Sequence, residues 1–427
     1  MMKQYLLLGA LITGGCAETV EAAQTLYVAN TLSSAPGLVY PIPTATNIPS
    51  TGISVADMPA RIAITPDGSR AYVVSPVSGV VTPITIATNS PGSPITVGPF
   101  PQGIVITADG STAYVVHAGT PASISSINLA TNTVGATTPL TGYEVTLGIL
   151  AISGSMLYIP VGTPSSPFFV LAVTIAGPTP VIEAAIPVGN TPIGIAVTPD
   201  GTTAYVANGG DNTLTPINLA TNSPGLAIFA GLFPRTVAIT PDGTQAYVTD
   251  AASSLAIIST ATNTFTGSIP LPGFIPQDLV ITADGKMAYV SVTGATNGIL
   301  AIDLVTQTVV ATIVPVTPAN FNLSLALTPA SAQPASPVPT AVTGLLQKNV
   351  FLNVTERVLT ITWQPSIQQG VLFYRIYNGT NIIGTVMADQ PLSFITRVNR
   401  AMVAQGFSVT AVTAAGQGVP IPVPISS

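Results

Sequence analysis

The chain offers few side chains for catalysis, and most of these are isolated in the sequence. It contains one histidine, His117, one cysteine, Cys16, and sixteen acidic residues among 427. A single histidine and a single cysteine cannot supply the usual ligands of a zinc site. A Ser-His-Asp triad would have to use His117, and no nucleophile-elbow motif surrounds it. We therefore expect no catalytic role for His117 and predict an exposed loop position at the end of a strand.

The acidic residues divide into a repeated set and a scattered set. The repeated set consists of the aspartates of five Asp-Gly turns, Asp67, Asp109, Asp200, Asp242 and Asp284. In such turns the aspartate hydrogen-bonds its own backbone and glycine takes a positive φ, so we predict a structural role. The scattered carboxylates lack the spacing of a calcium loop. A catalytic or metal-binding carboxylate cluster could be assembled only from distant parts of the chain, and we predict no metal and no cofactor.

Arginine is the residue type with the clearest recognition chemistry, because it binds planar carboxylates or sugar acids with two parallel hydrogen bonds. Two of the seven arginines, Arg61 and Arg235, stand just before equivalent strands of the repeat described next. Gln102, Gln277 and Asp278 stand at equivalent places in other copies. In a closed ring these five would circle one mouth of a central channel. Either they bind a ligand there, or the arginines pair with Asp278 or loop carbonyls and only hold the mouth together.

A sequence repeat determines where these residues lie. Its core reads Ile-Ala-Ile-Thr-Pro-Asp67-Gly68, then Ala-Tyr72-Val, and Ala-Thr-Asn89 follows at the next turn. It returns in most cases after about 42 residues, a period typical of propellers. In this copy we predict strands over 61–65, 71–75, 80–86 and 94–97, and four-stranded antiparallel units of this kind are propeller blades.

Two positions of the repeat carry packing information. The tyrosine of Ala-Tyr-Val is expected to pack between neighbouring blades and to find a partner for its hydroxyl group. The first strand carries a small or short residue between larger aliphatic ones, which suits strands that crowd around an axis. These short residues are Ala63, Val105, Ala151, Ala196, Ala238, Val280 and Ala326.

Counting copies predicts how the ring closes. Six complete copies begin near residues 61, 103, 149, 194, 236 and 278; the third is degenerate, with Ser153-Gly154 in place of Asp-Gly. The N-terminal Leu26–Asn30 segment lacks a first strand, and the Leu323–Leu327 segment lacks a second. Together they make one more blade. We therefore predict an all-β fold, a seven-bladed β-propeller over residues 24–329 with split-blade closure, which protects its end edges.

The motifs Tyr-Val-Ala-Asn30, Tyr-Val-Ala-Asn208 and Tyr-Val-Thr-Asp250, with the Asp-Gly and Ala-Thr-Asn turns, resemble the YVTN family of β-propeller repeats. The resemblance covers roughly residues 24–330. It implies the propeller fold and a surface or secreted location, because the family includes surface-layer and secreted proteins. Related seven-bladed folds include lactonases and the heavy subunits of amine dehydrogenases. The resemblance implies no particular reaction.

Residues 330–340 are rich in Pro, Ala and Ser and predict a semi-rigid linker. Residues 341–427 are predicted to form a small β-sandwich, with strands over 358–363, 372–377, 382–386 and 407–413. Leu359-Thr-Ile-Thr-Trp363, Tyr374-Arg-Ile-Tyr377 and Phe407-Ser-Val-Thr resemble a fibronectin type III module. Trp363 is then expected in the core of that sandwich.

The N-terminus predicts export. Lys3 precedes an apolar stretch over residues 5–12, so residues 1–23 read as a signal peptide. Thr13-Gly14-Gly15-Cys16 also resembles a bacterial lipoprotein box, although Thr13 departs from it, and it makes Cys16 a candidate for lipidation. Cleavage near Val20-Glu21-Ala22 would instead remove Cys16. The protein would then be secreted rather than anchored at the cell envelope.

Charge and composition limit the classes of molecule that the protein could bind. Charged residues make up 6% of the chain, the net charge is −6 and the pI is about 4.5. No Lys/Arg cluster is present, which excludes nucleic acid as a partner. We expect a membrane contact only through a lipid anchor. The sequence favours a non-enzymatic surface binding or scaffold protein whose partner is a protein or glycan; the alternative is an exported hydrolase or lactonase acting at the channel mouth.

Overall fold

The computed structural model describes residues 24–30, 36–119, 121–146, 148–163, 167–177, 179–314 and 323–329, and the strands within 340–426. The signal peptide with Cys16 and the linker residues 330–339 lie outside this part. The chain divides into two units, residues 24–331 and a second that contains residues 332–427. Apart from one 3-10 turn, η1 (Ile86–Thr88), the described elements are β-strands. No helix in the described part is long and apolar enough to cross a membrane.

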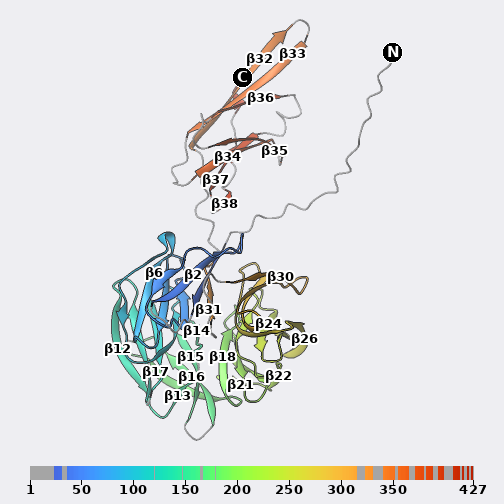
Figure 1. The fold of residues 1–427 in the computed structure, drawn as a ribbon. Coiled ribbons are helices and arrows are strands. Elements are labelled where there is room, and N and C mark those ends of the chain that lie inside the picture. The colour runs from blue at the N-terminus through green and yellow to red at the C-terminus, as the bar shows by residue number, and fades with distance from the viewer. Residues whose placement is uncertain are drawn as a thin grey trace. The chain divides into compact units, whose positions relative to one another are not determined.

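Residues 24–331 form a seven-bladed β-propeller, as predicted (Figure 1). Each blade is an antiparallel sheet whose strands follow one another from the inside outward. The first blades are β31 (Leu323–Leu327), β1 (Thr25–Asn30), β2 (Gly37–Pro43) and β3 (Ile53–Val55); β4 (Arg61–Ile64), β5 (Arg70–Ser75), β6 (Val80–Thr85), β7 (Ser90–Pro91) and β8 (Ile95–Thr96); β9 (Pro101–Ile106), β10 (Thr112–His117), β11 (Ala122–Asn128) and β12 (Thr133–Leu140).

The remaining four blades continue in chain order. They are β13 (Glu144–Val145), β14 (Ala151–Ser153), β15 (Met156–Gly162), β16 (Phe168–Thr174) and β17 (Val181–Pro187); β18 (Pro192–Val197), β19 (Thr203–Asn208), β20 (Thr213–Asn218), β21 (Ser223–Pro224) and β22 (Ile228–Phe229); β23 (Val237–Ile239), β24 (Gln245–Asp250), β25 (Ser254–Ser259) and β26 (Thr264–Pro270); β27 (Phe274–Ile281), β28 (Met287–Gly294), β29 (Gly298–Asp303) and β30 (Thr308–Ile313).

The ring closes through the split blade. β31 pairs antiparallel with β1, with Leu26 opposite Leu327 and Asn30 opposite Leu323. Beyond the paired residues, Thr328 N donates to Thr25 O at 2.9 Å, and Thr25 N donates to Thr328 Oγ1 at 2.9 Å. The N-terminal segment therefore completes the blade that the C-terminal end of the propeller begins, which confirms the predicted closure and leaves neither end strand unpaired.

The Asp-Gly turns have the predicted structural role. At Asp67 the carboxylate accepts from Thr65 Oγ1 at 2.5 Å and from Ser69 N at 3.0 Å, while Gly68 takes a φ of +68°. The same two contacts recur at the other four Asp-Gly aspartates. These hydrogen bonds lower the pKa of Asp67, Asp109, Asp200 and Asp242 below the ordinary carboxyl value.

The register explains why a short residue recurs in the first strand. In every blade that residue lies directly opposite the repeated tyrosine: Ala63 faces Tyr72, Ala238 faces Tyr247 and Ala326 faces Tyr27. The tyrosines are almost fully buried. A short neighbour leaves space for the ring where two blades meet, which adds a packing reason to crowding at the axis.

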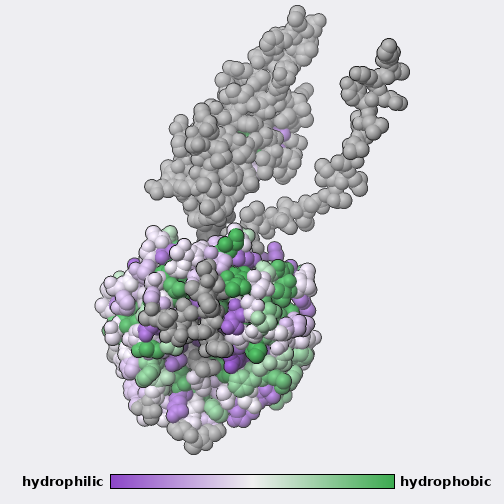
Figure 2. Space-filling view, viewed as in Figure 1, coloured by the Kyte–Doolittle hydropathy of each residue, from purple (hydrophilic) through white to green (hydrophobic). Residues whose placement is uncertain are grey.

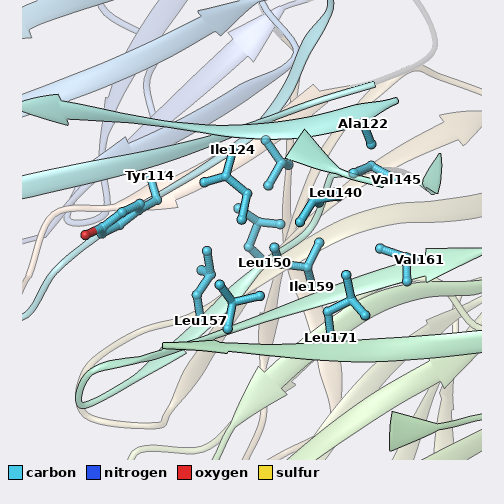
Figure 3. Packing of buried hydrophobic residues seen from close by; sticks show 12 residues of the cluster. Tyr114, Ala122, Ile124, Leu140, Val145, Leu150, Leu157, Ile159, Val161 and Leu171 are labelled. Carbon is cyan, nitrogen blue, oxygen red and sulfur yellow. The ribbon is translucent and has the colours of Figure 1, made fainter. Parts of the chain in front are cut away.

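The tyrosine ring packs against the following blade, as predicted. Tyr72 of the second blade packs with Ile104 and Ala113 of the third. The next interface has the same construction: Tyr114 and Ile124 of the third blade belong to one cluster with Leu157 and Leu171 of the fourth. Figure 3 shows the side chains of this cluster between the strands of the two blades. Blade-to-blade burial of this kind is the main apolar core of the propeller.

The tyrosine hydroxyl reaches the Asn turn of the following blade. Four such tyrosine-to-asparagine hydrogen bonds, of 2.5 to 3.1 Å, join neighbouring blades. The pairs are Tyr27–Asn89, Tyr72–Asn132, Tyr205–Asn263 and Tyr289–Asn47. The last of them spans the closure. Each of these asparagines has a φ between +50° and +55°, which asparagine tolerates better than other non-glycine residues.

Some outer strands differ from expectation. The strand predicted over 94–97 is only Ile95–Thr96, and a separate short strand, Ser90–Pro91, precedes it. The fifth blade is interrupted in the same way at Ser223–Pro224. Proline cannot donate to the ladder, so it splits the outermost strand.

The second unit contains two sheets. The strands predicted over 358–363, 372–377, 382–386 and 407–413 are present, within β33, β34, β35 and β37. One sheet has the order β36-β33-β32-β40 and the other β35-β34-β37-β38, with β39 paired to β37. The strands are β32 (Thr340–Phe351), β33 (Val354–Gln364), β34 (Val371–Asn378), β35 (Asn381–Met387), β36 (Ser393–Val398), β37 (Phe407–Thr413), β38 (Gly416–Gln417), β39 (Ile421–Pro422) and β40 (Ile425–Ser426). The side chain of Trp363 lies outside the described residues, and its core position stays a prediction.

Candidate functional site

A pocket of about 290 Å³ lies at the ends of the innermost strands that are opposite to the Asp-Gly turns. All seven blades contribute a residue to its lining, so the pocket is on the axis of the ring. These residues occupy two adjacent positions of the repeat, near the start of the innermost strand. They include Leu323, Arg61, Gln102, Ile149, Ile193, Arg235 and Gln277.

The structure brings together all of the predicted mouth residues. Arg61, Gln102, Arg235, Gln277 and Asp278 line this one pocket. Their side chains come from the second, third, sixth and seventh blades. That these residues bind a ligand stays a prediction, but their juxtaposition is a property of the fold.

Arg235 is the most constrained cation of the pocket. Its Nη1 donates to Gln277 Oε1, and its guanidinium lies 5.8 Å from the centre of the Phe233 ring, within cation–π range. Burial lowers the pKa of Arg235, although an arginine stays protonated at neutral pH. No carboxylate within the described part forms an ion pair with Arg235. The pocket therefore holds a half-buried positive charge that a neutral amide and a ring only partly stabilise.

Asp278 has a different part in the site. Its Oδ1 accepts from Leu279 N at 2.9 Å, and its Oδ2 accepts from Leu325 N at 3.1 Å. Leu325 belongs to β31, the strand on which the ring closes. Asp278 therefore links the seventh blade to the split blade through the backbone. Both carboxylate oxygens of Asp278 thus accept from backbone N–H groups, and in the described part of the chain neither forms an ion pair with Arg235.

The other side of the pocket holds Arg61 and Gln102. Arg61 opens β4, and its Nη1 donates to the carbonyl of Ala60 at 3.4 Å. Gln102 belongs to β9, where the degenerate fourth blade comes very close. A Cβ atom on Gly103 would overlap the carbonyl oxygen of Gly148. The two glycines thus let the third and fourth blades meet backbone to backbone beside the pocket.

Part of the lining is apolar and was not predicted from the sequence. Met58, Pro76 and Val77 also face the pocket. Met58 has a φ of +49° and precedes a proline, and Phe100 and Phe233 do the same in other blades, at +49° and +48°. An Xaa-Pro pair before each of these innermost strands was the available sequence signal. That signal carries no polar group, so it does not mark a recognition residue by its chemistry.

The prediction for His117 was wrong. It is not an exposed loop residue but the last residue of β10, with 4% of its surface exposed. It occupies the repeat position of Asn30, Asn208 and Asp250, which are buried too. These second strands are covered by neighbouring blades on both faces, so a polar residue at their end must find internal partners.

His117 has such partners. Its Nδ1 lies 3.1 Å from Pro99 O, and its Nε2 lies 3.0 Å from Ser125 Oγ. Desolvation lowers the pKa of His117, which favours the neutral ring. Ser125 has no exposed surface. This His–Ser pair is therefore closed to a substrate and supports the local fold.

Groups that could bind a metal ion are dispersed. Among the described residues, no three His, Cys, Asp or Glu side chains come together as a candidate metal site. The surface around them is mostly of neutral hydropathy: pale residues dominate the propeller in Figure 2, with hydrophobic and hydrophilic ones scattered among them.

Comparison with known proteins gives the fold and no more. No protein-family model matches the chain, and no curated protein matches it. Among solved structures, a hydrazine synthase chain of Kuenenia stuttgartiensis is similar, with 20% identity, a TM-score of 0.56, and coverage of 69% of this chain and 99% of that chain. A functionally unknown protein from Desulfotomaculum acetoxidans is also similar, with 20% identity, a TM-score of 0.59, and coverage of 70% and 98%. At this identity the likeness shows the fold alone.

Proposed function

We propose that this chain is an exported, non-enzymatic binding and scaffold protein that recognises a protein or glycan partner at the cell surface. The observation that carries the proposal is the axial pocket. There, four of the seven blades bring two arginines and two glutamines to one concave site. Convergent polar groups in a concave, partly apolar pocket are the usual features of a binding site.

The types of side chain favour binding over catalysis. Arginine and glutamine donate hydrogen bonds but are poor general acids or bases at neutral pH. The carboxylate of Asp278, the only acid among the described lining residues, already accepts hydrogen bonds from two backbone N–H groups. His117 is buried among its own partners, away from the lining.

Several features support membership of the YVTN type and a fibronectin type III-like second unit. The buried polar residue after Tyr-Val-Ala or Tyr-Val-Thr ends the second strand in three blades. In the second unit, nine described strands divide between two sheets that are antiparallel except for the parallel pair β32–β40, similar to a small sandwich. The predicted signal over residues 1–23, with Cys16 as lipid acceptor or as part of the removed peptide, belongs to the same proposal.

The proposal is tested with a glycan array and a pull-down from cell-surface extract, using the full chain and the Arg61→Ala/Arg235→Ala variant. We expect the variant to lose the bound glycan or protein. Arg70→Ala is the matched control, because Arg70 donates to Leu129 O at the opposite end of its blade. Binding that survives in the double variant would remove the mouth from the proposal.

The alternative of an exported hydrolase or lactonase is tested separately. Metal analysis of the purified chain and an assay on simple lactones address it directly. Stoichiometric metal together with turnover that requires the mouth residues would replace the binding proposal by the enzymatic one.

A further inference from the structure

The loops around the mouth hold large residues in an unfavourable backbone conformation. Met58, Phe100, Thr191 and Phe233 have φ values between +48° and +52° and each precedes a proline. This region is unfavourable for bulky residues, and glycine or asparagine would fit it better. Three of the four positions nevertheless carry a large apolar side chain.

These apolar side chains are not hidden in the core. Met58 is 38% exposed, Phe233 39% and Phe100 60%. Val77 is 61% exposed and lines both the axial pocket and an adjoining depression of about 200 Å³ that Phe100 also lines. Phe233 packs on the guanidinium of Arg235, and Phe100 lines only the adjoining depression. Contact with an apolar ligand in the axial pocket accounts for the exposed Met58 and Val77.

The positive charge of the pocket indicates that the polar group of such a ligand is an anion. Its lining carries Arg61 and Arg235 against Asp278 alone, which leaves one net positive charge. Asp278 is held by backbone N–H groups. Arg235, whose guanidinium has five donors, donates one hydrogen bond within the described part of the chain, to Gln277, which leaves it donors for an incoming anion. A monoanion balances this charge, and a planar carboxylate fits the fork of an arginine.

We propose that the axial pocket binds a small carboxylate carried by an apolar body. The carboxylate contacts Arg61 and Arg235, and the apolar body lies against Met58 and Val77. The volume of about 290 Å³ is near the lower end of ligand pockets, about 300 Å³, and suits a group the size of one aromatic residue. This inference rests on the proposed function and names the chemistry that its mouth recognises.

Two sources share this chemistry, a free aromatic acid and the C-terminal residue of a chain. Calorimetric titration of the full chain with N-acetyl-phenylalanine and with a tripeptide ending in phenylalanine covers both. We expect at least one acid to bind, and the tighter of the two identifies the source. The matching C-terminal amides should bind about 10-fold more weakly or worse, because they lose the charge-assisted hydrogen bonds. Acetate should also bind weakly, because it lacks the apolar body.

Variants locate the binding. Arg235→Gln should lower the affinity for the acid by about 10-fold or more, whereas Arg235→Lys should lower it less because it keeps the charge. Val77→Ser should lower the affinity for the acid but not the affinity for acetate. Arg70→Gln, at the far end of its blade, should change nothing, and thermal unfolding of each variant checks that the ring is intact.

Equal binding of acid and amide, an unaltered affinity in folded Arg235→Gln, or no binding of either acid at millimolar concentration would overturn the inference. The two proposals fail separately. A glycan or protein that binds through the mouth while both acids do not would leave the proposed function standing and remove only the carboxylate.

Discussion

The repeated tyrosine and asparagine act as a pair across blades. The ring of each tyrosine fills the interface, and in four places its hydroxyl donates to the asparagine of the next blade. The third blade lacks such a partner, because the corresponding turn of the fourth blade, residues 174–180, contains no asparagine. The motif is therefore a connection between neighbours rather than a set of catalytic hydroxyl groups.

Removal of one hydroxyl measures this connection. Tyr27→Phe keeps the ring but loses the 2.6 Å hydrogen bond to Asn89, and should lower the free energy of unfolding by about 1 kcal/mol. Tyr114→Phe is the control, because no Tyr114–Asn bond exists within the described part of the chain. Chemical denaturation of both variants gives the comparison. Equal losses would mean that the hydroxyl contributes through something other than the asparagine.

Alkaline pH acts on the same residue. Burial raises the pKa of Tyr27 to about 12, whereas an unfolded tyrosine titrates near 10. The folded state therefore binds the proton more tightly. The contribution of the protonated Tyr27 hydroxyl to the free energy of unfolding is complete below about pH 10 and is lost as the pH rises through the folded pKa. We expect the unfolding midpoint to fall between pH 10 and 12, and to fall less steeply in Tyr27→Phe, as followed by circular dichroism. Parallel curves for the two proteins would contradict this assignment.

At the scale of elements, the position of a strand within its blade determines its burial. Second strands such as β5 are buried along almost their whole length, while outer strands such as β26 and β30 are exposed. The split blade obeys the same order, although β31 and β1 are about 300 residues apart in the chain. Closure thus depends on a strand of only five residues, Leu323–Leu327.

Two truncations test that dependence. A chain that ends at residue 331 retains β31 and should unfold cooperatively as a monomer. A chain that ends at residue 322 lacks it, exposes the edge of β1 and should aggregate or unfold at lower temperature. Size-exclusion chromatography and thermal unfolding compare the two. If both truncated chains behave alike, the ring does not depend on β31.

The blades and their closure could be predicted because the chemistry that fixes them is local. Pro-Asp67-Gly68 determines a turn wherever it occurs, and alternating strands follow. The prediction of an exposed His117 was wrong because it rested on the sequence of a single strand and not on the repeat. Alignment with Asn30 and Asn208 marks it as a buried repeat position. The apolar wall at Met58 was not predicted, because the Met58-Pro59 pair marks the position but a positive φ is not expected at a methionine.

At the scale of the whole molecule, the residues that differ between blades lie together at the mouth of the ring. Turn, taper and packing residues recur from blade to blade, while the mouth differs in each: two blades contribute arginine and two glutamine, and others contribute Ile149, Ile193 and Leu323. Such asymmetry on the axis of a nearly symmetric scaffold makes one oriented site from seven similar parts. The Arg61 and Arg235 side chains occupy one pocket only because the ring is closed.

A crystal structure of the chain soaked with N-acetyl-phenylalanine tests the axial binding site most directly. We expect density at the axis, with the carboxylate on Arg61 and Arg235 and the ring beside Met58 and Val77. A ligand seated elsewhere on the propeller, or a mouth that stays empty at saturating concentration, would contradict it.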